Sequence, residues 1–289
     1  MMGTPLAYVR GEFVPLDQAT IPLEDRGFLF ADAVYETIVA YHGKPFRLED
    51  HLLRFQRSAS EIHLTIEFDL GWLKKIILEG IQRAGFDPAK IYMQLTRGTG
   101  PREHVPSRPL KPTLILTFRA HTPVPPEHIE KGIRLHAYPD LRWKRCDIKT
   151  TMLLPNVLAK MEALEKGFHD ALLVREDGVI TECTSAAFGV FRGNTLIFPS
   201  LGPQILPSIT RKVVIEEAQA LGYEVQEGIL RFEDLREVDE AFLCSTLQDV
   251  TPVVQVDEIQ IGDGKPGTRT LALLERYRDR LERETKGER

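Results

Sequence analysis

Apolar residues recur along the chain at two spacings, one typical of helices and the other typical of strands. In LEDHLLRFQRSASEI, Leu52, Phe55 and Ile62 fall on one side of a predicted helix. DLGWLKKIILEGIQRAG repeats this spacing and runs into Gly85, a residue type suited to end a helix. The later runs IYMQLTRG and PTLILTF are short and rich in β-branched and apolar residues, which predicts strands. Residues 1–120 are therefore predicted to form a small domain that contains both helices and strands.

A proline-rich stretch interrupts this pattern. HTPVPPEHIEKG carries Pro123, Pro125 and Pro126 between two strand-like runs, so we predict a linker at residues 121–126. The runs IRLHAY, DALLV, AAFGVF and AFLCS that follow are typical of strands, and the Asp-Gly pair in LLVREDGVITE predicts a hairpin. Residues 127–289 are predicted to form a larger domain with a mixed or antiparallel sheet. The expected fold class is thus α+β with two domains, and we expect the functional site in the cleft between them.

Two helices stand out among the predicted strands of this larger domain. LPNVLAKMEALEKG places Val157, Leu158, Met161 and Leu164 on one helical face. SITRKVVIEEAQALG begins at Ser208, a residue type that favours the first position of a helix. The later GDGKPG has the glycine spacing of a dinucleotide-binding loop, but no βαβ unit follows it. We interpret it as a turn before a last helix.

The composition narrows the class of protein. The net charge is −5 and the basic residues are spread along the chain, which argues against nucleic acid and membrane surfaces as partners. No apolar run approaches the roughly 20 residues of a membrane-spanning helix, and the first residues lack the apolar core of a signal peptide. We therefore expect a cytoplasmic protein. Its three cysteines fit no metal-binding pattern and are predicted to be buried thiols.

A lysine in RWKRCDIKTTMLLPNVLAK is the first candidate for chemistry. Lys149 ends a polar stretch that runs into an apolar helix, so its amine could be held at the domain cleft. An amine that attacks a carbonyl must lose its proton, and the positive neighbours Arg142, Lys144 and Arg145 would favour that loss. The alternative interpretation is an ordinary solvated lysine.

Other segments carry residues suited to a phosphate-bearing cofactor. Glu182 in VITECTS follows the predicted hairpin, and pyridoxal chemistry needs a carboxylate beside the pyridine nitrogen. The helix start in LPSITRKVV offers free N–H groups and the Thr210 hydroxyl to an anion. Ser245 and Thr246 form a second hydroxyl pair, and Arg54 could bind phosphate through two hydrogen bonds. Each of these residues could equally be an ordinary strand, capping or surface residue.

A loop rich in glycine and proline follows the predicted strand IYMQLTRG. Its sequence, RGTGPREHVP, places Arg102 and His104 two residues apart. An arginine with a nearby histidine is suited to bind a carboxylate, and loops of this kind often carry binding residues. A solvated loop without a ligand is the alternative.

Taken together, these segments resemble one protein family. EDRGFLFADAVYETI, HLLRF, RGTGPREH, RCDIK, LLPNVLAK, VITE, SITR and STLQDVTPV occur in the order found in class IV (fold type IV) aminotransferases. The resemblance runs from about Tyr8 to the last predicted helix. Within the family, the sequence is most similar to bacterial D-amino acid aminotransferases. The resemblance implies a two-domain fold with a small N-terminal α/β domain and a larger mixed-sheet domain.

The resemblance also implies a role for each candidate residue. Lys149 would hold pyridoxal 5′-phosphate as a Schiff base and move a proton between the substrate Cα and the cofactor C4′. Glu182 would pair with the ring nitrogen, and Arg54 would bind the phosphate. The family's dimeric arrangement, in which the loop with Arg102 reaches the partner subunit, implies a homodimer acting on amino acids and 2-oxo acids. The further implied contacts are to the phosphate from Ile209, Thr210, Ser245 and Thr246, to the ring from Leu206, and to the substrate carboxylate from Tyr35, Arg102 and His104.

Two features favour D-amino acids as substrates. L-specific branched-chain members resemble one another in a Thr-Ala turn that receives the carboxylate, and this place reads Thr246-Leu247 here. Arg102 and His104 match the loop of the D-specific members. An L-branched-chain aminotransferase and an aminodeoxychorismate lyase on the same fold are the alternatives.

The sequence departs from the family pattern at two places. The usual FGDGVYE reads FADAVYE, with Ala31 and Ala33 in place of glycines. Ala186 and Ala187 stand where a serine-asparagine pair commonly follows the glutamate. These changes are expected to alter the shape of the pocket and not the residues that bind the cofactor.

Overall fold

The computed structural model describes residues 3–287. The chain divides into two compact units, and each unit draws on separate stretches of sequence. Unit 1 contains the residues up to Thr122, Ile148–Met152 and the residues from Leu281 on; unit 2 contains Pro123–Asp147 and Leu153–Arg280.

Two stretches of the contiguous large domain expected over residues 127–289, Ile148–Met152 and the residues from Leu281 on, are grouped with unit 1. For Ile148–Met152, the physical reason is that this segment forms backbone hydrogen bonds with a strand of unit 1 and inserts Ile148 into the core of that unit. The linker expected at residues 121–126 and the boundaries on either side of it stay predictions.

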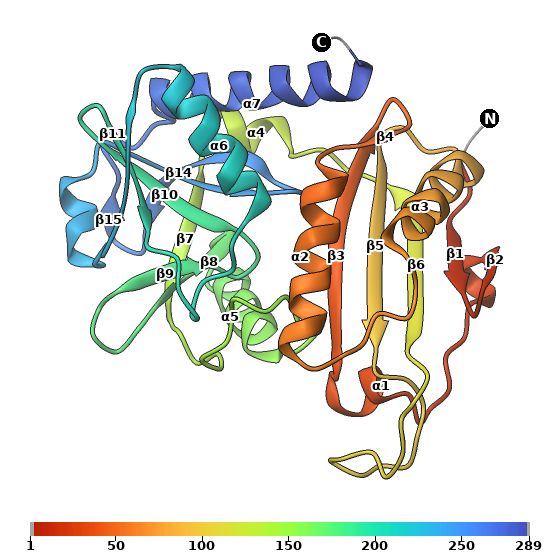
Figure 1. The fold of residues 1–289 in the computed structure, drawn as a ribbon. Helices are drawn as coiled ribbons and strands as arrows, with labels where there is room; N and C mark the ends of the chain where they lie inside the picture. Colours follow the sequence, from red (N-terminus) through yellow and green to blue (C-terminus); the bar gives the residue numbers. More distant parts are fainter. Residues whose placement is uncertain (1–2, 288–289) are drawn as a thin grey trace. The chain divides into compact units, whose positions relative to one another are not determined.

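Unit 1 is built on an antiparallel sheet with the strand order β2-β1-β6-β5-β3-β4 (Figure 1). The two strands expected from IYMQLTRG and PTLILTF are confirmed as β5 and β6. The edge pair β1 and β2 is too short for its alternation to be recognised in the sequence. The strands are β1 (Leu6–Val9), β2 (Glu12–Pro15), β3 (Ala33–Tyr41), β4 (Lys44–Pro45), β5 (Ala89–Thr96) and β6 (Thr113–Ala120).

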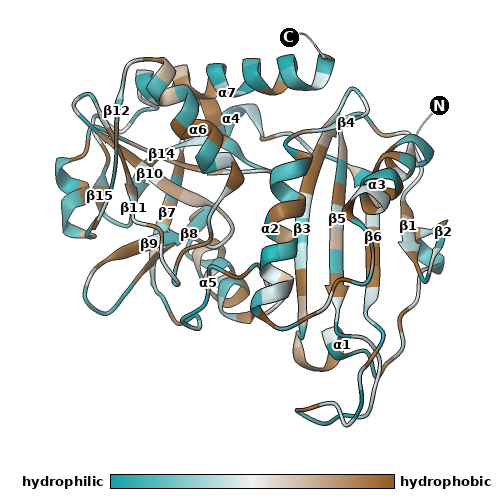
Figure 2. Cartoon of the chain, in the orientation of Figure 1, coloured by the Kyte–Doolittle hydropathy of each residue, from teal (hydrophilic) through white to brown (hydrophobic). Residues whose placement is uncertain are grey.

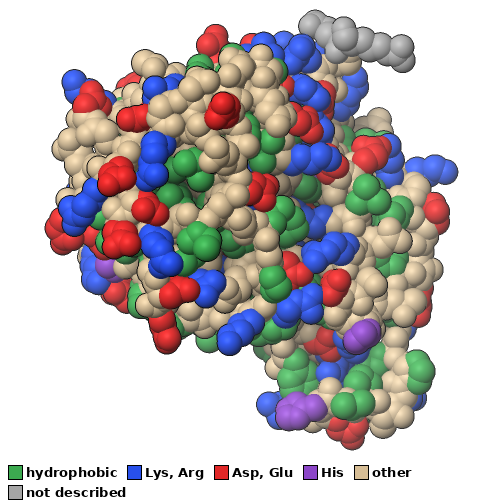
Figure 3. Space-filling view, turned by 60° about the vertical axis from the view of Figure 1, so that its left-hand side comes forward, with side chains coloured by type: hydrophobic (Ala, Val, Ile, Leu, Met, Phe, Trp, Pro, Cys, Tyr) green, Lys and Arg blue, Asp and Glu red, His purple; other side chains and the backbone are tan. Residues whose placement is uncertain are grey.

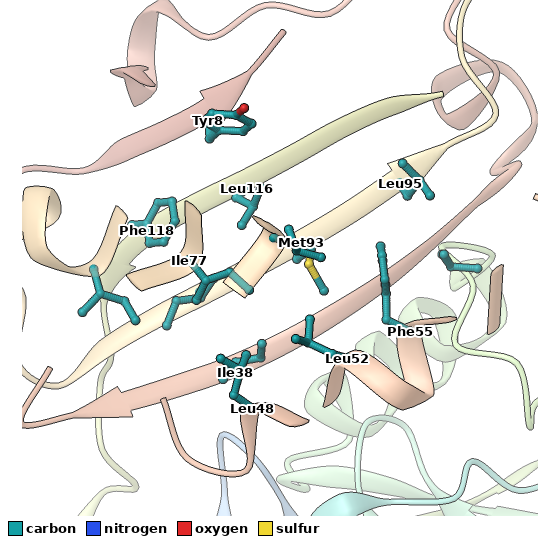
Figure 4. Packing of buried hydrophobic residues seen from close by; sticks show 14 of the residues in the cluster. Tyr8, Ile38, Leu48, Leu52, Phe55, Ile77, Met93, Leu95, Leu116 and Phe118 are labelled. Atoms are coloured by element: carbon teal, nitrogen blue, oxygen red, sulfur yellow. The ribbon is translucent and has the colours of Figure 1, made fainter. Parts of the chain in front are cut away.

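Helices α2 (Leu48–Glu61) and α3 (Leu70–Ala84) pack on this sheet and confirm the two helices predicted from sequence. Figure 4 shows Leu52 and Phe55 pointing from α2 toward the apolar side chains of the strands. In Figure 2, hydrophobic and hydrophilic residues alternate along α2, as expected for a helix with one buried side. The Asp69 carboxylate accepts a hydrogen bond from the N–H of Trp72 at 3.0 Å at the start of α3, and Gly85 ends it at φ +69°. The remaining helices of this unit are η1 (Leu16–Gln18) and α1 (Arg26–Phe30).

Unit 2 contains a mixed sheet with the strand order β12-β11-β10-β13-β14-β7-β8-β9, and β15 pairs with β14. The pairs β11–β12, β14–β7 and β7–β8 are parallel, and the others are antiparallel. The mixed sheet and the hairpin predicted at Gly178 are therefore confirmed. The strands are β7 (Ile133–Pro139), β8 (Asp170–Val174), β9 (Ile180–Cys183), β10 (Ala187–Arg192), β11 (Thr195–Pro199), β12 (Glu224–Gly228), β13 (Glu240–Ser245), β14 (Asp249–Val256) and β15 (Ile259–Gln260).

Several helices of the second half contact strands of this sheet. Ser208 caps the predicted helix α6 by accepting a hydrogen bond from the N–H of Arg211 at 3.2 Å. The turn predicted from GDGKPG is confirmed, because Gly262 and Gly264 adopt positive φ between β15 and the last helix. Within the described part of the chain, none of the helices has the length and apolar character that crossing a membrane requires. The helices are α4 (Pro126–Glu130), α5 (Leu154–Glu165), α6 (Ile209–Ala220), η2 (Glu233–Glu237) and α7 (Thr268–Lys286).

Helix α5 buries a different side from the one that its large apolar residues define. Ala159 and Ala163 are fully buried in a cluster with Ala171 and Leu173 of β8. The small alanines let α5 lie close to β8, and the large apolar side chains project from the other faces of the helix and are exposed. The exposed residues are Leu154, Val157, Leu158, Met161 and Leu164.

Charged side chains of both signs are interspersed over the molecular face in Figure 3. This mixture fits the small net charge of −5. The three cysteines, Cys146, Cys183 and Cys244, are buried free thiols, as predicted.

Candidate active site

The segment with Lys149 is held against β3 next to an isolated antiparallel bridge between Val34 and Thr150. The Tyr35 N–H donates to the Lys149 carbonyl at 3.0 Å, and the Thr151 N–H donates to the Ala33 carbonyl at 3.2 Å. The Lys149 N–H in turn donates to the Ser58 hydroxyl of α2 at 3.2 Å. Because Lys149 lies directly opposite Tyr35, its Nζ is 4.3 Å from the centre of the Tyr35 ring. The predicted reactive amine and the predicted pocket tyrosine are therefore neighbours within unit 1.

A buried carboxylate next to Tyr35 fixes Arg54. Glu36 is fully buried on the side of β3 that faces α2, and Arg54 donates to it through Nε at 2.7 Å and Nη2 at 2.8 Å. The Nδ1 atom of His51, one turn earlier on α2, lies 2.7 Å from Glu36 Oε2. Burial alone would raise the pKa of Glu36, but Arg54 and His51 lower it to about 2. Burial lowers the pKa of His51, and its hydrogen bond to Glu36 opposes this shift.

Glu36 and His51 were missed in the sequence. Their signal was present, because Glu36 interrupts the apolar side of β3 between Val34 and Ile38. A charged residue at such a position needs a buried partner, which α2 supplies as His51 and Arg54. These contacts make Glu36 a positioning residue for Arg54.

Arg102 and His104 lie on the loop between β5 and β6, which extends past the strand ends beside α1 (Figure 1). Both side chains contact Phe30 of α1. The guanidinium carbon of Arg102 is 5.3 Å from the centre of the Phe30 ring, and the His104 ring centre is 5.9 Å from it. Gly98 at the base of this loop has φ +101°, and a Cβ there would lie 2.0 Å from the Lys111 carbonyl oxygen.

Glu182 of β9 lies in a buried cluster in unit 2. Its carboxylate is ion-paired with Nη1 of Arg142, and the N–H of Leu206 lies 3.4 Å from Oε2. Arg142 also donates to Asp140 through Nε at 2.9 Å and Nη2 at 2.8 Å. Burial raises the pKa of Glu182, and Arg142 opposes that shift. Arg142, expected as a charged neighbour of Lys149, thus forms ion pairs with two carboxylates of unit 2.

The start of α6 and the end of β13 are neighbours in unit 2. Burial raises the pKa of the Cys244 thiol to about 12, and the positive charge of Arg211, in the first turn of α6, opposes that shift. Ile209 and Thr210 are buried at this helix start, and their N–H groups have no acceptor within the helix. Ser245 and Thr246, which both carry hydroxyl groups, follow Cys244 directly in the sequence. Main-chain N–H groups and hydroxyls gathered at a helix N-terminus are suited to bind a phosphate group.

These residues fit pyridoxal 5′-phosphate by their chemistry. A lysine amine can bond to its aldehyde, a buried carboxylate can stabilise its protonated ring nitrogen, and a helix start can bind its phosphate. The predicted residues are divided between the units, and each unit supplies part of this set. Unit 1 contains Tyr35, Arg54, Arg102, His104 and Lys149; unit 2 contains Glu182, Leu206, Ile209, Thr210, Ser245 and Thr246.

The sequence pattern of the family Amino-transferase class IV matches residues 33–256. The match covers most of the chain, and the chain therefore belongs to this family. The resemblance inferred from the motifs and the α+β fold of that family are confirmed. Class IV aminotransferases use pyridoxal 5′-phosphate, so the protein is a pyridoxal-phosphate-dependent aminotransferase.

The chain is similar over nearly its whole length to curated bacterial enzymes. It is 36% identical to the D-alanine aminotransferase of Staphylococcus haemolyticus, and the alignment covers 95% of this chain and 97% of that enzyme. It is 34% identical to the D-alanine aminotransferase of Listeria monocytogenes serotype 1/2a, over 95% of this chain and 96% of that enzyme.

Solved structures of another branch share the fold. The T.th. branched-chain amino acid aminotransferase with pyridoxamine 5′-phosphate is 28% identical, with a TM-score of 0.89. That alignment covers 99% of this chain and 98% of the other. The branched-chain aminotransferase of Thermoproteus uzoniensis with norvaline, at 24% identity and a TM-score of 0.86, covers 99% and 98% and shares the fold alone.

Proposed function

We propose that this aminotransferase exchanges an amino group between D-amino acids of the alanine and glutamate type and 2-oxo acids, as a homodimer in the cytoplasm. The observation that carries the proposal is the 36% identity to a D-alanine aminotransferase over 95% of the chain. Arg102, His104 and Leu247, the residues that favoured D-substrates in the sequence, support it.

Each residue of the site then has a task. When bound, pyridoxal phosphate supplies an electron sink that makes the substrate Cα–H acidic. Lys149 holds the cofactor and moves a proton between the substrate Cα and the cofactor C4′. The Tyr35 ring lies next to its amine. Glu182 supplies the negative charge for the ring nitrogen, and Leu206 packs on the ring. The phosphate is bound by Arg54, Ile209, Thr210, Ser245 and Thr246.

Exposed apolar side chains support the homodimer. On α5, Met161 and Leu164 are 51% and 55% exposed, along a face that is apolar from its first turn. In unit 1, Leu23, Phe28 and Val105 are exposed at 80%, 67% and 79%, near the loop that carries Arg102. Large apolar surfaces of this kind are typical of contacts between subunits. We propose a second copy of the chain as the partner, because the loop with Arg102 is expected to serve the partner's site.

Replacing Arg102 by alanine is expected to raise the KM for D-alanine by about 10- to 100-fold, the value of a charge-assisted hydrogen-bond pair. The cause is loss of the guanidinium that binds the substrate carboxylate. Steady-state kinetics with D-alanine and 2-oxoglutarate measure the effect. Arg108→Ala, an exposed arginine of the same loop, is the matched control and should leave the KM unchanged. An unchanged KM in Arg102→Ala would remove this residue from the carboxylate site.

Mixing subunits tests whether the loop acts on the partner. The test uses dimers in which one subunit carries Lys149→Ala and the other carries Arg102→Ala. If the loop crosses to the partner, one of the two sites in such a dimer has both wild-type residues. Random reassembly should then restore about one quarter of wild-type kcat/KM at low D-alanine, because half of the dimers carry one complete site. The control is a mixture of Arg102→Ala with the double variant, which offers no complete site. No gain after verified subunit exchange would place Arg102 and Lys149 in the same subunit's site.

The structural similarity to branched-chain enzymes supports an L-specific alternative. An assay that offers D- and L-alanine, D- and L-glutamate and D- and L-leucine separately, each with a 2-oxo acid, separates the two functions. Products resolved on a chiral column should be formed from D-substrates. Turnover of L-leucine alone would overturn the D-specific proposal, and no turnover of any amino acid would favour the lyase.

A further inference from the structure

Arg26 is a buried arginine whose side chain binds the loop that carries Arg102 and His104. It lies at the start of α1 and is 4% exposed. Its Nη1 donates to the Glu103 carbonyl at 2.5 Å, and its Nη2 donates to the His104 carbonyl at 3.0 Å. One planar guanidinium thus donates hydrogen bonds to two consecutive carbonyls of the loop, a geometry that a lysine ammonium cannot reproduce.

A carboxylate fixes the orientation of the Arg26 side chain. Asp32 accepts from Arg26 Nε at 2.8 Å and, through both oxygens, from Arg97 Nε and Nη2 at 2.8 and 2.9 Å. Burial alone would raise the pKa of Asp32, but the two arginines lower it, so Asp32 stays charged at neutral pH. Arg97 also donates to the carbonyls of Ile62 and His63 at the end of α2. The two arginines therefore share Asp32, but the Arg97 side chain binds the end of α2 and the Arg26 side chain binds the loop at residues 103 and 104.

The base of the loop is tied to the same helix start by other bonds. Asp25 accepts from the Gly27 N–H at 2.8 Å and from the Thr96 hydroxyl at 3.0 Å. The Arg26 N–H donates to the Gly98 carbonyl at 2.9 Å. These contacts hold the loop where it leaves β5, whereas the Arg26 side chain holds it several residues further on, at the predicted substrate-binding residues.

We propose that Arg26 is the positioning residue of the carboxylate site. By fixing the backbone at Glu103 and His104, it sets the directions of the Arg102 and His104 side chains. The Phe30 ring supports the same arrangement, with the guanidinium carbons of Arg26 and Arg102 at 4.8 and 5.3 Å from its centre. This inference rests on the proposed function, in which Arg102 and His104 bind the substrate carboxylate.

The test compares Arg26→Gln and Arg26→Lys with Arg97→Gln in the cofactor-loaded enzyme. Arg97 is the matched control because it binds the same carboxylate from the first position of the loop, while its side chain donates to Ile62 and His63 and not to Glu103 and His104. Both Arg26 variants should raise the KM for D-alanine about tenfold, with kcat and cofactor affinity changed by less than about threefold. Arg97→Gln should lower the thermal midpoint comparably and leave the KM near the wild-type value. Arg26→Lys keeps the positive charge beside Asp32, so it provides a folded variant if the glutamine form is unstable.

A double-mutant cycle separates positioning from general stability. In the Arg102→Ala background, Arg26→Gln should add less than about twofold to the KM, because the side chain that it orients is gone. The role of Arg26 would be overturned if the KM effects of Arg26→Gln and Arg102→Ala multiplied in the double variant. It would also be overturned if Arg97→Gln raised the KM equally. A wild-type KM in the Arg26 variants would overturn it as well. Failure of the proposed function looks different: the wild-type enzyme itself would not turn over D-amino acids.

Discussion

Lys149→Ala is expected to lower kcat by more than about 10³-fold, because one side chain both holds the cofactor and moves the proton. The structure makes this loss specific to the amine. The Lys149 backbone is bound to β3 through the Tyr35 N–H and to α2 through the Ser58 hydroxyl, and alanine keeps both bonds. The fold should therefore survive, and the thermal midpoint should change little.

Absorbance spectra and single-turnover kinetics on the purified variant measure the effect. The absorbance of the covalently held cofactor should disappear, while noncovalent binding through the phosphate persists. Lys75→Ala is the control, since Lys75 is an exposed lysine of α3 with no role in the proposed site. An active Lys149→Ala enzyme with the wild-type spectrum would show that another group carries the cofactor.

Glu182→Gln is expected to lower kcat by about 100-fold, the scale found when an electrostatic group aimed at a developing charge is removed. A neutral amide cannot stabilise a positive charge on the ring nitrogen, so the cofactor becomes a weaker electron sink. Arg142 loses one of its two carboxylates but keeps Asp140. The free energy of unfolding should therefore fall by only about 1–3 kcal/mol.

Glu217→Gln is a matched control for this effect. Glu217 is 2% exposed and is ion-paired with Arg276 and Arg280, so it is also a buried carboxylate of unit 2. Its replacement should lower stability in urea unfolding by a similar amount and leave kcat unchanged. Equal losses of kcat in both variants would mean that Glu182 acts through stability alone. Cofactor affinity, measured by titration of the apoenzyme, gives a second comparison of the two variants.

The elements that the sequence predicted best are those whose local signals agree. The helix α3 has an amphipathic stripe, a capping aspartate at Asp69 and a glycine at Gly85, and all three are local features. The segments with Lys149 and Glu182 could likewise be singled out, because each family motif is contiguous in the sequence. The side of α5 that is buried could not be predicted, because a periodic pattern identifies an apolar face but not what covers it. Ala159 is buried, and the larger apolar residues of α5 lie outward.

The parts of the site that were missed depend on contacts between distant segments. Arg26 and His51 resemble surface residues when each is considered alone, and Glu36 is marked only by its position on the apolar side of β3. Their roles follow only from partners far away in the sequence, such as the Glu103 carbonyl for Arg26. In the same way, the bonds between Lys149 and β3 join residues that no local pattern connects.

The grouping of Ile148–Met152 with unit 1 has a consequence for the growing chain on the ribosome. The edge of β3 beside Tyr35 waits for its partner until synthesis has passed residue 152, and unit 1 is complete only after residues beyond Leu281 have emerged. The N-terminal unit therefore cannot finish folding before the C-terminal one has been made. A gene fragment for residues 123–280 would encode unit 2 together with Ile148–Met152 of unit 1, so the two units cannot be separated by a single cut in the gene.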